Sequence, residues 1–177
     1  PLVFVRAWSI MDVLLDGPVA MLVFHQAIFW LGLWLLVKNL FRSTVLQVLV
    51  LLILGFFPVI QTLMGTVWKD ASLLSSGILG LGLLLQAKRK QSPWLYIPAL
   101  LAFAYMSAVR HNGLLAALPM LWLMANSGSL LKTSIRTAGL TVIVLGLAFG
   151  MNHSSTVKKY PHLINQVLVW DLWGMSL

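Results

Sequence analysis

The residues of this 177-residue chain that could act as an acid, a base or a metal ligand are few and fall between long apolar runs. The chain contains no Glu, and its acidic residues are Asp12, Asp16, Asp70 and Asp171. It also contains no Cys, which excludes a disulfide framework, a thiol nucleophile and a Cys-ligated metal. Acid–base or metal chemistry therefore depends on the four Asp and four His side chains.

Trp68, Lys69 and Asp70 form one compact group, at a polar turn between two apolar runs. In a structural interpretation Trp68 anchors at the membrane–water interface, Lys69 extends to water and Asp70 caps the next helix. In a functional interpretation Lys69 neutralises a phosphate, while Asp70 holds a cation or orients an acceptor. The two interpretations can hold together. Adjacent residues do not face each other on a helix, so Lys69 and Asp70 are not expected to form an ion pair.

Arg110, His111, Asn112 and Gly113 form a second group, at another polar turn. Structurally, Arg110 complements the end of one helix, Asn112 caps the next helix and Gly113 permits the turn. Functionally, an Arg beside an exposed helix N-terminus is an anion site, and His111 could move a proton.

Asp12 and Asp16 are four residues apart, which places both carboxylates on one face if residues 9–16 are helical. Their like charges would repel each other, which makes one of them a candidate general base. The alternative is a solvated segment with no chemistry. His25 and Gln26 lie inside an apolar run, where an ionisable residue is a functional candidate, although a single His more commonly makes a hydrogen bond between helices.

Apolar helices must position these residues. Of all residues 60% are hydrophobic and 9% are charged, with a mean hydropathy of +0.93, whereas soluble domains carry about 25% charged residues. The runs are long, Leu-rich and not alternating, which favours helices over strands. We predict an all-α fold, a polytopic transmembrane helical bundle of about six spans plus an outer interfacial helix. The predicted spans are 18–37, 44–65, 71–87, 93–109, 113–125 and 134–151.

The net charge is +8, and the basic residues lie in short segments between the apolar runs. This placement indicates membrane topology and does not indicate a surface that binds nucleic acid. Short loops on one side of the predicted bundle hold Lys38, Arg42, residues 88–90, Lys132 and Arg136 and contain no acid. We place these loops in the cytoplasm of a multi-pass protein of the cell membrane, the bacterial inner membrane. Residues 1–17 are then an outer juxtamembrane segment, 18–151 the transmembrane region, and 152–177 an outer segment with an interfacial helix or the start of a further span.

Three further features bear on packing and chemistry. Pro58 should kink the second span, and glycines in the third and sixth spans, including a GxxxG spacing at Gly146 and Gly150, should allow close helix packing. The chain contains no P-loop, GxGxxG, HExxH or GxSxG motif. ATP-driven or redox chemistry by this chain alone is therefore not expected.

In order and sidedness these motifs resemble a bacterial branch of the GT-C superfamily of membrane glycosyltransferases, over roughly residues 20–177. In that branch a Trp-Lys-Asp turn precedes an Arg-His-Asn-Gly or Arg-Asn-Asn-Gly turn and a later Asp-Leu, here residues 68–70, 110–113 and 171–172. The resemblance implies transfer of a sugar from a polyprenyl-phosphate carrier to an acceptor on the outer face, with Arg110 and Lys69 on the phosphate. An Asp of the first outer loop would be the base or bind a divalent cation, which Asp12 or Asp16 would match. The family's first span would precede Pro1, so we expect a piece of a longer chain.

Two other hypotheses remain open. A transporter or flippase half-bundle would suit the kinked second span, the intramembrane His25 and Gln26, and Pro98 and Pro119, but no internal repeat is visible. A structural subunit without chemistry would explain every motif. The discriminating observation is the shape of the outer face. An enzyme needs a polar cavity where Lys69, Asp70 and Arg110 converge and that opens sideways to lipid, whereas in a structural subunit these groups point apart into water.

Overall fold

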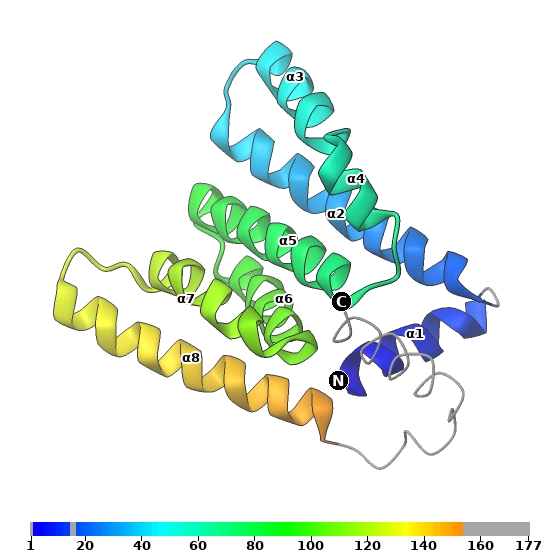
Figure 1. Cartoon of the computed structure of the whole chain (residues 1–177). Helices are drawn as coiled ribbons and strands as arrows, with labels where there is room; N and C mark the ends of the chain where they lie inside the picture. Colours follow the sequence, from blue (N-terminus) through cyan, green and yellow to red (C-terminus); the bar gives the residue numbers. More distant parts are fainter. Residues whose placement is uncertain (1, 15–16, 154–177) are drawn as a thin grey trace.

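A computed structural model describes residues 2–14 and 17–153, and this part of the chain is helical throughout, without a strand (Figure 1). The elements in chain order are α1 (Leu2–Leu14), α2 (Pro18–Leu40), α3 (Thr44–Gly55), α4 (Pro58–Met64), α5 (Lys69–Lys90), the 3₁₀ turn η1 (Pro93–Leu95), α6 (Tyr96–Val109), α7 (His111–Ala125) and α8 (Leu130–Asn152). The predicted all-α fold is confirmed over these residues.

Among the described residues three helices are long and apolar enough to cross a membrane, namely α2, α5 and α8, and the bent pair α3–α4 would make a fourth span. Each of the six predicted spans coincides with a helix or a helix pair, but the count of six is not confirmed. The reason is length: α6 has 14 residues and α7 has 15, which rise about 21 and 22 Å, against a hydrocarbon core of about 30 Å. The predicted interfacial helix of 152–177 lies outside the described residues.

Helix α5 is the centre of the bundle and packs against α2 on one side and α6 on the other, as Figure 1 shows. The approach of α2 to α5 depends on two glycines. A Cβ atom added to Gly32 would lie 2.5 Å from the backbone nitrogen of Leu79, and one added to Gly82 would lie 2.8 Å from the carbonyl oxygen of Gly32. The predicted role of the third-span glycines in close packing is confirmed.

The predicted kink at Pro58 is confirmed as a break between α3 and α4, whose axes differ by 62°. Pro58 opens α4, where its missing N–H costs no helical hydrogen bond. The side-chain amide of Gln61 donates a hydrogen bond to the carbonyl oxygen of Gly55, the last residue of α3. The carbonyl oxygen of Gly55, which the break leaves without a helical partner, thus accepts a hydrogen bond from within the chain.

Large apolar side chains are exposed around the bundle, above all on α3 and α8. Gly55 is the one buried residue of α3, while Val45 and Ile53 are 68% and 64% exposed. Soluble monomers rarely expose continuous apolar surface of this kind, so these helices fit a lipid environment. The GxxxG spacing of α8 does not pack against any other described helix, because no atom of the described residues lies within 4 Å of a Cβ added to Gly146 or Gly150.

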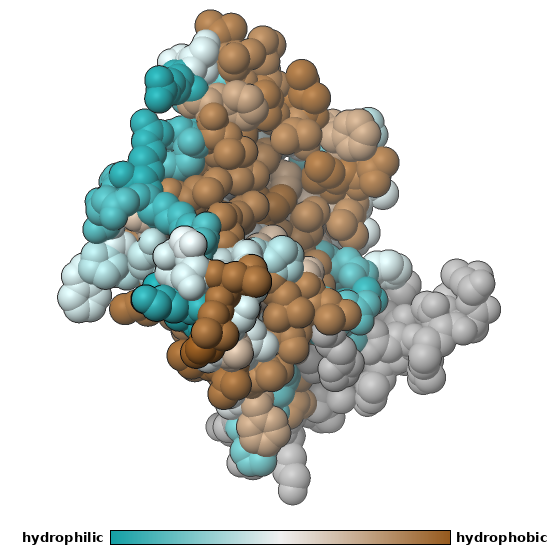
Figure 2. Space-filling model, turned by 90° about the vertical axis from the view of Figure 1, so that its left-hand side faces the viewer, coloured by the Kyte–Doolittle hydropathy of each residue, from teal (hydrophilic) through white to brown (hydrophobic). Residues whose placement is uncertain are grey.

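The basic loops gather at one end of the bundle. A nitrogen of Arg89 donates to the carbonyl oxygen of Lys38 at 2.9 Å, and the Lys88 ammonium donates to the carbonyl oxygen of Leu123. Figure 2, which views this side of the molecule, shows hydrophilic residues along one edge and hydrophobic surface over much of the rest. We call this end of the bundle the basic end. It contains Lys38, Arg42, residues 88–90, Lys132 and Arg136. The opposite end, where α5 starts, is the Asp70 end.

Candidate functional site

The first turn of α5 and the junction of α6 with α7 meet at the Asp70 end. A guanidinium nitrogen of Arg110 lies 2.8 Å from a carboxylate oxygen of Asp70, so the two side chains form an ion pair. The Arg110 side chain is 45% exposed and that of Asp70 is 30% exposed, so both can be reached from outside. Two residues 40 positions apart in the sequence, one from each predicted polar turn, are therefore brought together.

Two predicted helix caps are wrong. Helix α5 begins at Lys69, with Trp68 in the N-cap position, so Asp70 lies inside the first turn. Helix α7 begins at His111 with Arg110 as N-cap, so Asn112 also lies inside its helix, and neither N-cap side chain makes a capping hydrogen bond. An acidic group in the first turn is still favoured by the helix dipole, which leaves Asp70 free to pair with Arg110 instead.

Gly113 allows α6 and α7 to meet so closely at Arg110. Its N–H donates to the carbonyl oxygen of Arg110 at 2.9 Å. A Cβ atom at this position would lie 2.2 Å from the carbonyl oxygen of Met106, one turn before the end of α6. A larger residue would therefore move α7, and with it the backbone that holds Arg110.

Asn152 joins three helices at the same end. Its amide nitrogen donates to the carbonyl oxygens of Ala108 on α6, at 2.9 Å, and of Ala148 on α8, at 3.2 Å. Its amide oxygen accepts a hydrogen bond from the N–H of Val3 at the start of α1, at 3.1 Å. The end of α8 thereby fixes α1 beside the turn that holds Arg110.

Arg6 of α1 also belongs to this region. One terminal nitrogen donates to the carbonyl oxygen of Met151 at 2.9 Å. Its Nε and Nη2 atoms are buried and have no hydrogen-bond partner among the described residues. These two nitrogens form one edge of the planar guanidinium, the edge that binds a carboxylate or phosphate through two parallel hydrogen bonds. Because a buried cation without partners is costly, this edge is suited to an oxyanion.

A buried pair of polar side chains, His25 and Ser72, connects α2 to the first turns of α5. The Nε2 atom of His25 on α2 lies 2.5 Å from the hydroxyl oxygen of Ser72 on α5, and both residues are fully buried. The His25 ring also stacks on Phe4 of α1, with ring centroids 6.2 Å apart. His25 therefore makes a hydrogen-bonded contact between α2 and α5. Its partner Ser72 lies two residues after Asp70 in α5.

Of the remaining predicted residues, the structure describes Asp12, Trp68 and Lys69 but not Asp16 or Asp171. A carboxylate oxygen of Asp12 accepts a hydrogen bond from the N–H of Gly17 at 2.8 Å, which stabilises the turn between α1 and α2. Lys69 lies beside Asp70 in the first turn of α5, and Trp68 is 47% exposed just before it. Asp16 lies outside the described residues, as do Asp171 and the rest of 154–177.

A divalent cation finds no ligand set in the part of the chain that is described, because no three His, Cys, Asp or Glu side chains there come together. The chemistry available at the Asp70 end is that of one accessible carboxylate and two guanidinium groups. Such a site binds and orients an oxyanion and can take up a proton.

Comparison with protein-family models, curated proteins and solved structures gave no match to this chain. The family resemblance stated from the sequence motifs therefore stays a hypothesis. The argument for function depends on the residues of the Asp70 end.

Sequence reasoning missed Arg6 and Asn152 as site residues. Neither residue belongs to a motif that the sequence analysis identified. A signal existed for Asn152, because an amide at the end of an apolar helix must find hydrogen-bond partners where water is scarce. No sequence pattern indicated that these partners would be α1 and α6.

Proposed function

We propose that this chain is an integral membrane glycosyltransferase that moves a sugar from a polyprenyl-phosphate carrier to an acceptor at the Asp70 end. The observation that carries the proposal is the Asp70–Arg110 ion pair, which unites the two polar turns at one accessible place. The unpartnered edge of Arg6 adds a second donor for an oxyanion in the same region.

In the proposed reaction the guanidinium of Arg110 turns from Asp70 to the carrier phosphate, with Arg6 as the second cation. The acceptor hydroxyl oxygen attacks the anomeric carbon of the sugar, and the bond from that carbon to the phosphate oxygen breaks. The proton of the hydroxyl passes to the carboxylate of Asp70, and the leaving polyprenyl phosphate carries the electron pair of the broken bond. Lys69, in the same helical turn as Asp70, adds positive charge beside the phosphate.

The proposal includes the membrane arrangement. Helices α2, α5 and α8 span the bilayer, α3–α4 crosses as a broken span, and α6 and α7 form a short hairpin in a locally thinner region, which gives six crossings. The basic end faces the cytoplasm of a bacterial inner membrane by the positive-inside rule, and the Asp70 end faces outward.

Binding tests the phosphate site. The full chain in lipid nanodiscs is titrated with polyprenyl monophosphate and binding is followed by tryptophan fluorescence, which eight Trp residues provide. Because a hydrogen bond to a charged group contributes about 1.5–3 kcal/mol, Arg110→Ala should weaken binding about tenfold or more. Arg42→Ala, at the basic end, is the matched control and should bind as the wild type does.

Transfer tests the carboxylate. Asp70→Asn keeps the shape of the side chain but cannot accept the proton, so it should abolish transfer of a radiolabelled hexose from its polyprenyl-phosphate carrier while binding persists. Asp12→Asn tests the base that the family resemblance implies. Transfer at the wild-type rate by both Arg110→Ala and Asp70→Asn would remove the proposed site.

A transporter is the second candidate, and the 62° break between α3 and α4 favours it. Broken helices are common at the substrate sites of transporters. Proteoliposomes that contain the full chain distinguish the two candidates. Movement of a fluorescent lipid between leaflets, sensitive to Pro58→Leu and insensitive to Asp70→Asn, would favour the transporter over the enzyme.

A further inference from the structure

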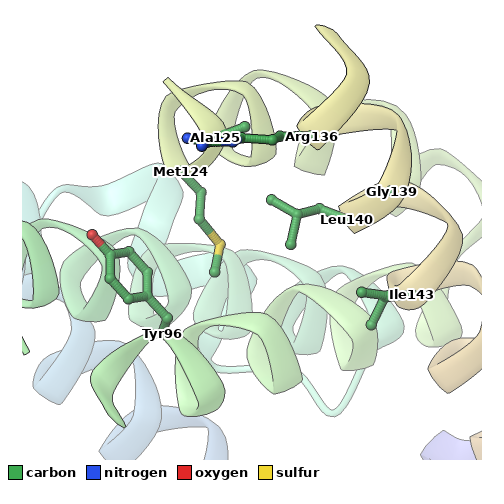
Figure 3. Close-up of a pocket in the computed structure, with 7 residues that line it drawn as sticks. All are labelled: Tyr96, Met124, Ala125, Arg136, Gly139, Leu140 and Ile143. Carbon is green, nitrogen blue, oxygen red and sulfur yellow. The ribbon is translucent and has the colours of Figure 1, made fainter. Parts of the chain in front are cut away.

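A cavity lies at the basic end, away from the Asp70–Arg110 pair. It has a volume of about 390 Å³ and opens between the start of α6, the end of α7 and the first half of α8. Figure 3 shows its lining residues from these three helices. This volume is at the lower end of the range for small-molecule sites, about 300–1,000 Å³.

The lining of the cavity is mostly apolar, with Met124, Leu140 and Ile143 among its residues. Arg136 and Tyr96 are the two lining residues whose side chains carry a polar group, a guanidinium and a hydroxyl. In Figure 3 the nitrogens of Arg136 and the oxygen of Tyr96 lie to the left, and Leu140 and Ile143 lie to the right. A ligand with one anionic and one apolar part matches this division.

The polar groups of the cavity are available. Within the described residues the side chains of Arg136 and Tyr96 make no hydrogen bond or ion pair to other protein groups. Among the described residues no acid lies at the basic end either, because Asp12 lies at the turn between α1 and α2 and Asp70 pairs with Arg110 at the other end. An anion at Arg136 would therefore meet a field of one sign, without a competing carboxylate.

We propose that this cavity binds an anionic phospholipid of the surrounding membrane. The phosphodiester accepts hydrogen bonds from the guanidinium of Arg136 and the hydroxyl of Tyr96. The first part of one acyl chain packs against Met124, Leu140 and Ile143, and the rest of the lipid stays in the bilayer. Charge complementarity selects the lipid, and the apolar wall distinguishes it from a free phosphate ion.

Gly139 offers a way to block the cavity without disturbing the fold. It lines the cavity, and nothing lies within 4 Å of a Cβ atom built on it. Gly139→Leu should therefore fill the space that the acyl chain would occupy. Gly146→Leu, two turns further along α8 and equally open but outside the lining, is its matched control.

Arg136 has its own matched control. Arg42, an exposed residue at the same end, lies outside the cavity, so Arg42→Gln removes the same charge from the same end of the molecule. General attraction of a basic surface to anionic lipid predicts equal losses for Arg136→Gln and Arg42→Gln. A built site predicts a loss for Arg136→Gln alone.

The experiment uses native mass spectrometry of the full chain in detergent with added phosphatidylglycerol or phosphatidylcholine. We expect phosphatidylglycerol to bind preferentially, Arg136→Gln to weaken its binding about tenfold, and Gly139→Leu to prevent it. Arg42→Gln, Gly146→Leu and inorganic phosphate serve as comparisons. Equal losses for the two Arg variants, wild-type binding by Gly139→Leu, or equal binding of both lipids would each overturn the proposal. Sugar transfer is not measured, so the result is independent of the proposed enzyme activity.

Discussion

The close approach of α2 to α5 gives the sharpest prediction about stability. In Gly32→Ala the new methyl group would lie 2.5 Å from the backbone nitrogen of Leu79 and 2.7 Å from its Cα atom. Backbone atoms cannot rotate away as a flexible side chain can, so the two helices must separate. Overpacking of this kind costs about 1–3 kcal/mol.

A control variant isolates the packing cost. Ala is a better helix former than Gly by about 1 kcal/mol, a gain that both variants share in a helix interior. Gly146→Ala places its methyl group in open space, so it should show the gain alone. The free energy of unfolding should therefore differ between Gly32→Ala and Gly146→Ala by about 1–3 kcal/mol, with Gly146→Ala the more stable.

The measurement is reversible unfolding of each variant in mixed micelles, as the fraction of denaturing detergent is raised and tryptophan fluorescence is followed. Refolding from the denatured state must retrace the curve for the free energies to be comparable. Equal stability of the two variants would refute the argument, because it would mean that α2 and α5 do not approach each other at Gly32.

Three further predictions concern the Asp70 end and the broken span. Asn152→Leu removes hydrogen bonds to α1, α6 and α8, so it should destabilise the chain by about 1–3 kcal/mol and increase hydrogen exchange in α1, whereas unchanged exchange would contradict the role of Asn152. A double-mutant cycle of Asp70→Asn and Arg110→Gln should give a coupling of about 0.5–1 kcal/mol, small because both side chains are partly exposed, and no coupling would mean that the ion pair does not form. Pro58→Ala should reduce the 62° bend, which spin-label distances between the far ends of α3 and α4 would report as a longer separation, and an unchanged separation would assign the bend to other residues.

The helices from α2 to α8 could be predicted from the sequence, whereas α1 falls in residues 1–17, which were expected only as an outer juxtamembrane segment. Long apolar runs separated by Gly, Pro and charged residues fixed six apolar segments, and Pro58 marked the break in the second. The number of crossings could not be predicted in the same way. Length and composition place α7 below the ordinary span, and only packing against neighbours decides how such a short helix sits in a bilayer.

The candidate site was predicted in part. The alternation of short loops implied that Asp70 and Arg110 lie at one end, and the ion pair between them confirms it. The hydrogen bonds that join α1 to the end of α8, from Arg6 to Met151 and from Val3 to Asn152, connect residues more than 140 positions apart, which no local pattern encodes. Capping was mispredicted for Asp70, because α5 begins at Lys69 with Trp68 at the N-cap, which places Asp70 inside the first turn.

The close approach of α2 to α5 at Gly32 and Gly82 affects how the chain is assembled during biosynthesis. Gly32 and Gly82 are 50 positions apart, and the chain between them contains the rest of α2, the helices α3 and α4, and the first half of α5. At about 5–20 residues per second, a ribosome needs about 3–10 s to add that stretch. During this interval the face of α2 that holds Gly32 is open to lipid or to the insertion machinery. Of the described helices that contact α2, only α1, α3 and α4 are made before α5, so a chaperone or a waiting partner would have its best access before α5 emerges.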